Sequence, residues 1–229
     1  MVKRKLSLKK YGLAFILTLV VFLGGIIVGM VLENARLAEA KQTSLAEKVN
    51  LQSIQLQQKY IDSGLADCQS LNQILESNID ELTKKMNIVI GYSKGAIFNQ
   101  EEFQLQLQDY FLTEIQFLLI SQEIDKKCPR NNVRVVYFYN ENQNDIQGRI
   151  LDYLKLKFGE RLLVFSFDSN FLQEPMINIL LTSYNIKTFP AVVVENQVFE
   201  GQTTLEELIK TICQEFKKHA NIPKECSIF

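Results

Sequence analysis

Residues 184–201 read YNIKTFPAVVVENQVFEG and hold the densest structural signals in the chain. Pro190 stands directly before AVVVE, a β-branched run that is typical of a buried strand. A second short strand, QVFE, follows Asn196, which predicts a tight hairpin closed by Gly201. The segment therefore predicts the end of a helix, a short connection through a proline, and a β-hairpin.

Outward from this segment, the hydrophobic period alternates between that of strands and that of helices. Apolar stripes predict helices that end at Phe158, begin near Pro175 and begin after Thr203, where Glu206 completes a capping-box pattern. Continuous β-branched and aromatic runs predict buried strands. The four predicted strands are 133–139 (VRVVYFY), 162–167 (LLVFSF), 191–195 and 197–200.

The order strand, helix, strand, helix, strand, strand, helix, with a proline directly before the third strand, resembles the thioredoxin fold. The resemblance covers about residues 133–218. It implies an α/β domain in which the bond before Pro190 is cis, an uncommon state for an X–Pro bond. It also implies that the loop of Thr188, Phe189 and Pro190 is the part that contacts a bound peptide.

The redox motif of that family is missing. Thioredoxins carry Cys-x-x-Cys just after the first strand, where the helix dipole lowers the pKa of a thiol. The matching positions here are Gln143 and Ile146, and no cysteine lies between Cys128 and Cys213. No Ser or Thr in that loop offers a substitute nucleophile, so dithiol chemistry is not expected and the domain is not predicted to be an enzyme.

The four cysteines instead indicate structural disulfides, and four allow three connectivities. We favour Cys68–Cys128 together with Cys213–Cys226. Two alternatives stay open: Cys68 and Cys213 are buried free thiols at apolar helical positions, or Cys128 is a reactive thiol.

Residues 12–32, GLAFILTLVVFLGGIIVGMVL, carry no charge and are long enough to span a bilayer as a helix. Five Lys and Arg residues precede them, which predicts a cytoplasmic N-terminus and an extracytoplasmic body. We expect an uncleaved signal-anchor; the alternative is a signal peptide cleaved near Ala38-Glu39-Ala40. Gly25 and Gly29 form a GxxxG pattern that would let two such helices approach closely.

Residues 33–90 contain a single glycine, Gly64, and no proline. A heptad seam from Ile61 to Val89 predicts a coiled-coil helix, and a second helix is expected over about 100–126. A glycine-rich break at 91–95 allows these helices to fold back as a hairpin, with Cys68 and Cys128 at similar heights.

The second helix also carries a second apolar stripe, Leu105, Leu112, Ile115 and Leu119, so we expect it to pack against two elements. The other arrangement pairs the first helix with a second chain, and a weaker seam at Leu45, Val49 and Leu56 also allows a homodimer.

Charge and composition exclude several functional classes. Outside the basic first eleven residues, 20 basic and 26 acidic residues leave a net charge of −6, which argues against nucleic acid as a partner. The single histidine, His219, follows the last helix as a solvated cation, and no Cys/His spacing suits a metal. No cofactor motif is present.

The sequence therefore predicts five regions: a basic cytoplasmic end (1–11), a transmembrane helix (12–32), a helical stalk or coiled-coil hairpin (33–128), a thioredoxin-like domain (129–220) and a tail (221–229). The predicted function is a membrane-anchored, non-redox binding or scaffold module with the lipid bilayer and a protein as partners. The two alternatives are a membrane-tethered thiol-disulfide oxidoreductase and a purely structural coiled-coil protein.

Overall fold

The computed structural model describes residues 8–94, 100–129, 132–140, 146–218 and 222–227. The chain forms two compact units, Met1–Lys59 and Tyr60–Phe229. The first is almost entirely one helix, and the second contains a helical hairpin and a mixed β-sheet. Gln143 and His219, which the sequence analysis singled out, lie outside the described residues.

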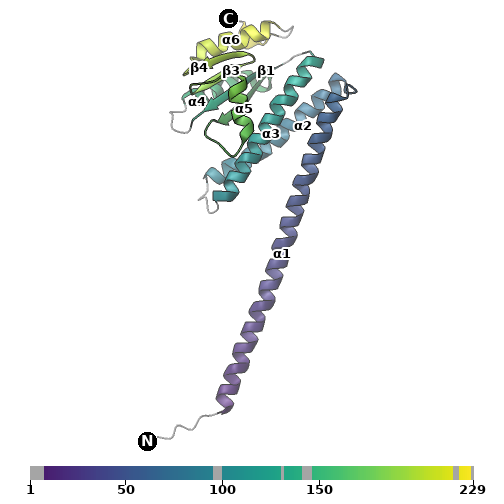
Figure 1. Cartoon of the computed structure of the whole chain (residues 1–229), viewed down its shortest axis with the longest axis vertical. Helices are drawn as coiled ribbons and strands as arrows, with labels where there is room; N and C mark the ends of the chain where they lie inside the picture. Colours follow the sequence, from purple (N-terminus) through teal and green to yellow (C-terminus); the bar gives the residue numbers. More distant parts are fainter. Residues whose placement is uncertain (1–7, 95–99, 130–131, 141–145, 219–221, 228–229) are drawn as a thin grey trace. The chain divides into compact units, whose positions relative to one another are not determined.

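Helix α1 runs without a break over Leu8–Asp62 (Figure 1). Within it, Phe15–Asn34 is long and apolar enough, by length and composition, to cross a bilayer. All the described side chains of this segment are exposed, as expected for a signal or anchor helix and unlike the buried core helix of a globular domain. No loop separates the apolar segment from the helix that follows it.

The helical region expected from residue 33 onward is interrupted after Asp62, where α1 ends. Gly64 has φ = 74°, a conformation that favours glycine, and its N–H donates to Ile61 O. The Asp67 carboxylate then accepts a hydrogen bond from Ser70 N–H at 2.8 Å and caps a new helix. The predicted heptad seam is therefore interrupted between Ile61 and Cys68.

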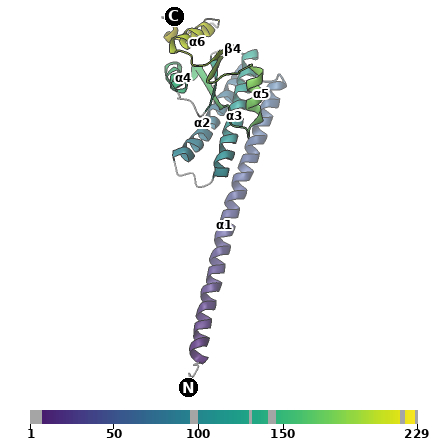
Figure 2. The ribbon, with the colours of Figure 1, turned by 60° about the vertical axis from the view of Figure 1, so that its left-hand side comes forward.

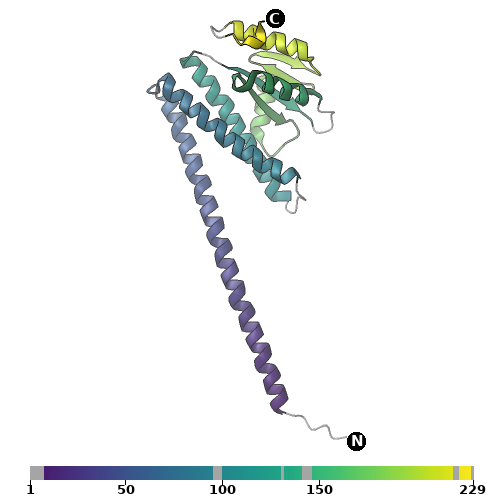
Figure 3. The same ribbon diagram turned by 180° about the vertical axis from the view of Figure 1, so that it is seen from behind.

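The predicted hairpin is confirmed. Helix α2 (Cys68–Lys94) packs along α3 (Gln100–Lys127), as Figure 3 shows from behind. α2 continues through Gly91, so the break falls at the later end of the glycine-rich stretch. One end of the hairpin is held by an apolar cluster of Ile61, Leu71, Ile120 and Ile124.

The four strands form one sheet in the order β2-β1-β3-β4. β1 (Val133–Tyr139) pairs parallel with β2 (Leu162–Asp168), and antiparallel with β3 (Ala191–Val194); β3 pairs antiparallel with β4 (Gln197–Glu200). The predicted strand positions and element order are confirmed, with the ends of β2 and β3 each differing by one residue. Helix α4 (Ile146–Phe158) with the short η1 (Gly159–Arg161) connects β1 to β2, and α5 (Pro175–Ser183) connects β2 to β3.

Helices cover both faces of the sheet (Figure 2). On one face, α4 and α6 (Leu205–Lys217) pack on alternate strand residues, including Val135 and Val192. On the other face, α3 and α5 pack on the intervening residues, including Phe138 and Val193. β1, β2 and β3 are largely buried on both faces, which explains why they read as nearly continuous apolar runs, whereas β4 is mostly exposed.

Helix α3 does contact two elements, α2 and the sheet, but of the predicted second stripe only Ile115 takes part in the contact with the sheet. Phe111, Ile115 and Leu118 face the sheet and are buried. The other members of that stripe are exposed: Leu105, Leu112 and Leu119. The N-cap of α6 is also one residue later than predicted, because Thr204 rather than Thr203 accepts the hydrogen bond from Glu207 N–H.

Candidate functional site

Three segments meet at one edge of the sheet. β1 ends at Tyr139 and β2 ends at Asp168, and because the two strands are parallel, their carboxyl ends lie side by side. β3 is antiparallel to β1 and starts just after Pro190 at this same edge. In open α/β sheets, ligands bind outside the carboxyl ends of the strands, so this edge is the candidate site.

The loop after β2 is held rigidly against the end of β1. Ser169 donates to Tyr139 O through both its main-chain N–H and its hydroxyl, each at 2.8 Å. Asn170 N–H donates to the Asp168 carboxylate at 2.9 Å. The Asn170 side chain donates to Asn140 Oδ1 at 2.7 Å. Four hydrogen bonds therefore fix the outer border of the site, so it does not depend on a ligand for its shape.

The bond between Phe189 and Pro190 is cis, as the thioredoxin resemblance predicted. Glu200 of β4 binds the two residues that precede this peptide bond. Its carboxylate accepts hydrogen bonds from Lys187 N–H and from the Thr188 hydroxyl, both at 2.8 Å. The Lys187 hydrogen bond is the main cause of a lowered pKa of Glu200. The carboxylate is therefore ionised at neutral pH and keeps both bonds.

The main chain of Phe189 is left unpaired. Pro190 O accepts from Gly201 N–H on the β4 side. Continuing the β1–β3 register by two residues from the Phe138–Ala191 pair places Phe189 opposite Asn140, just beyond the last residue of β1. Among the described residues, none forms a hydrogen bond with the N–H or C=O of Phe189. The N–H and C=O of Phe189 therefore offer one donor and one acceptor to an extended peptide.

Helix α4 begins next to this edge, but it carries no Cys, Ser or Thr. Its first residue, Ile146, is the second of the two positions that match the missing dithiol, and its side chain is 38% exposed. Gln147 is buried, and its side-chain oxygen accepts from Thr203 N–H at 2.8 Å. Among the described residues there is no group of three His, Cys, Asp or Glu side chains that would hold a metal ion.

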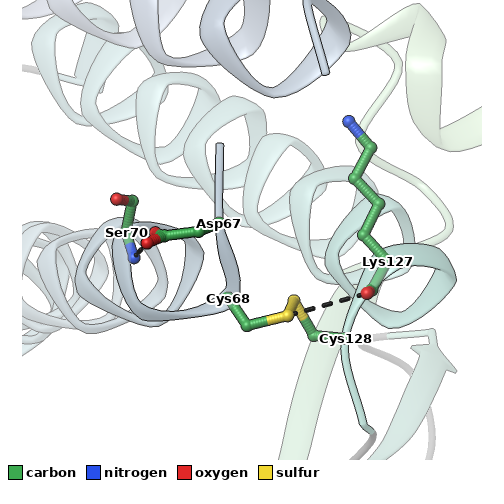
Figure 4. The surroundings of a disulfide bond; sticks show 5 residues. All are labelled: Asp67, Cys68, Ser70, Lys127 and Cys128. Carbon is green, nitrogen blue, oxygen red and sulfur yellow. Dashed lines mark hydrogen bonds between the residues drawn. A yellow bond between two sulfur atoms is a disulfide. The ribbon is translucent and has the colours of Figure 1, made fainter. Parts of the chain in front are cut away.

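All four cysteines form disulfides, in the pairing that we favoured from the sequence: Cys68–Cys128 and Cys213–Cys226. Figure 4 shows the first bridge, which joins the start of α2 to the residue after α3. No thiol is therefore available at the candidate edge. Two disulfides and an exposed apolar N-terminal helix together indicate a protein of the secretory pathway with an extracytoplasmic body.

Two buried polar groups were missed by the sequence analysis as partners in the fold. Arg134 of β1 is buried between Asp125 of α3 and Glu195 of the β3–β4 turn, and it forms an ion pair with each. Glu114 of α3 was assigned only to an apolar seam, yet it reaches the edge strand β2. No periodicity signals these contacts: Glu114 and Ser166 lie 52 residues apart in the chain, and Arg134 lies 61 residues from Glu195 and 9 from Asp125, on a different element.

No known family model matches this chain, and no curated protein does. Among solved structures, the chain is similar to one described as "Structure of a malarial protein". The two share 19% sequence identity over 40% of this chain and 100% of the other, with a TM-score of 0.32. A likeness at this score carries no argument about fold or function.

Proposed function

We propose that this chain is a membrane-anchored binding module with a thioredoxin-like fold and no redox activity. The observation that carries the proposal is the unpaired main chain of Phe189 at the edge where β1 and β2 end. A partner segment in an extended conformation adds to the sheet here as a short strand, held by main-chain hydrogen bonds. The neighbouring Thr188 side chain is exposed and lies within reach of such a segment.

The pairing of the cysteines supports a function without redox chemistry. A thioredoxin-like oxidoreductase attacks a disulfide with a thiolate at the helix N-terminus, and here every cysteine is already paired elsewhere. The measurement that separates the two functions counts free thiols by alkylation and intact mass on membrane-extracted protein. We expect no label before reduction and four labels after it. A fast-reacting Cys128 without reductant would support the oxidoreductase instead.

The anchor is the apolar segment of α1, with the N-terminus in the cytoplasm and the sheet domain outside. The five cations before the segment support this orientation, and the two disulfides support an oxidising side for the body. Because α1 continues as a helix to Asp62, it extends about 40 Å beyond the apolar segment. Alkaline extraction of membranes and protease protection of residues 60–229 test the anchor and the orientation.

The binding site is tested with extended peptides. Eight-residue peptides selected from a display library against the full chain in nanodiscs should lose affinity when alternate main-chain amides are N-methylated. They should also lose affinity for a Thr188→Arg variant, because the long cation obstructs the edge. The matched control is Thr83→Arg, which alters an exposed threonine of α2. Peptides that bind equally well to both variants, or a library that yields no binder, would contradict the proposal.

A further inference from the structure

The part of α1 that follows its apolar segment exposes large apolar side chains. From Gly12 to Ser53, every side chain that the structure describes is exposed; Ile54 is the first buried one. Leu45, Val49 and Leu56 are 62%, 56% and 68% exposed. An isolated helix in water gains little stability without packing on an apolar face, so this surface calls for a partner.

The spacing of these residues is that of a coiled-coil seam. Leu45, Val49, Gln52 and Leu56 are separated by four, three and four residues, which places them at positions d, a, d and a of a heptad. β-Branched Val49 at a and Leu45 at d is the combination that favours two parallel strands. Gln52 at the remaining d position adds a polar pair that is satisfied only when the two helices are in register.

The charges beside this seam favour a parallel pair. Lys41 and Lys48 occupy g positions, and in a parallel dimer they lie next to the e positions of the partner, Ala46 and Ser53. No like charges meet in that arrangement. In an antiparallel pair centred near Val49, the two Lys48 side chains would face each other and repel.

The occupant of this surface is a second copy of the chain. The apolar segment Phe15–Asn34 belongs to the same unbroken helix, so two copies inserted in one bilayer run parallel and at the same height. Residue 45 of one copy then meets residue 45 of the other without any adjustment. We propose that residues 45–56 of α1 form a parallel, in-register coiled coil with the same residues of a second copy; this step rests on the membrane anchor proposed above.

Disulfide scanning in native membranes tests this dimer. The wild-type cysteines are all paired, so a single added cysteine is the only free thiol. L45C, V49C and L56C should form disulfide-linked dimers several-fold faster under mild oxidation than S44C or L51C. Leu51 is a matched control because it is 56% exposed and equally apolar, but lies off the seam.

A second pair of variants distinguishes a specific dimer from cross-links that form by random collisions in the membrane. Val49→Lys should sharply reduce cross-linking through L56C, whereas Leu51→Lys should leave it unchanged. Cross-linking that is uniform around the helix, or equal in the two lysine variants, would overturn the coiled coil. Alkaline extraction of the same membranes separates the two proposals. Release of the chain would contradict the membrane anchor. Retention of the chain without a periodic cross-linking pattern would contradict only the dimer.

Discussion

Glu114 on α3 and Ser166 on β2 are joined by a hydrogen bond of 2.6 Å, in which the Ser166 main-chain N–H donates to the Glu114 carboxylate. β2 is an edge strand, and the outward-pointing N–H groups of an edge strand have no neighbouring strand to bond to; the Ser166 N–H finds its acceptor on α3 instead. The second carboxylate oxygen, Oε2, is buried without a hydrogen bond. Helix α3 therefore contacts the edge strand β2 through the Glu114 side chain, a carboxylate that is costly to bury when charged.

The stability of the domain should depend on pH through Glu114. Burial raises its pKa from 4.5 to about 8, although the bond from Ser166 acts in the opposite direction. The folded state keeps this proton where the unfolded chain has already released it. The free energy of unfolding should therefore decrease by roughly 3–5 kcal/mol as the pH rises from about 4.5 to about 8, and then level off.

A Glu114→Gln variant provides the check on this pH dependence. Its amide oxygen still accepts from Ser166 N–H but does not titrate, so urea unfolding followed by circular dichroism should show a much flatter profile between pH 5 and pH 8. Glu101→Gln, an exposed residue of the same helix, should keep the wild-type slope. An unchanged slope in Glu114→Gln would assign the pH dependence to another group.

Replacing Arg134 with Met should destabilise the fold by about 3–5 kcal/mol, because it removes the guanidinium that forms ion pairs with the buried carboxylates of Asp125 and Glu195. The Arg134 and Asp125 side chains are each 8% exposed, so water cannot replace the lost partner. Lys126→Met removes an exposed ion pair with Glu123 and should cost about 1 kcal/mol or less. Similar unfolding midpoints for the two variants would show that the buried network contributes little.

The two disulfides should differ in their contribution to stability. Cys68–Cys128 closes a loop of 60 residues and Cys213–Cys226 one of 13. Loop-closure entropy in the unfolded chain predicts losses of about 4 and about 3 kcal/mol when each pair is replaced by Ser. Urea unfolding of both double variants measures the difference. A larger loss for the shorter loop would mean that packing around the sulfur atoms outweighs chain entropy.

The carboxylate of Glu200 should control the order of the loop before Pro190. In Glu200→Ala, Lys187 N–H and the Thr188 hydroxyl both lose their acceptor, so hydrogen exchange at the Lys187 amide should accelerate at least several-fold. Glu207→Ala, in the first turn of α6, should leave exchange at this amide unchanged. Because the pKa of Glu200 is lowered, the wild-type protection should persist at neutral pH and disappear only in acid. Unchanged exchange in Glu200→Ala would show that the loop is ordered by other contacts.

The disulfide pairing illustrates how far the local pattern reaches. A glycine-rich turn and helical spacing placed Cys68 and Cys128 at similar heights on a hairpin, and the structure joins them. The break in the helix at Gly64 was not predicted from the sequence, because one glycine within a helical pattern costs only about 1 kcal/mol and does not by itself end a helix. Asp67 followed by Ser70 was the available signal for a new N-cap.

The strands, the helices of the sheet domain and the apolar N-terminal segment were predictable from the sequence, because each depends on neighbouring residues. The cis bond before Pro190 was predictable only through the resemblance to the thioredoxin fold. The contacts of Glu114 with β2 and of Arg134 with Asp125 and Glu195 were not. The exposure of Leu105, Leu112 and Leu119 was not predictable either, since periodicity marks an apolar stripe but does not say what covers it. Burial and pairing depend on which surfaces the folded chain brings together, most of them from separate elements, and only the tertiary structure determines that.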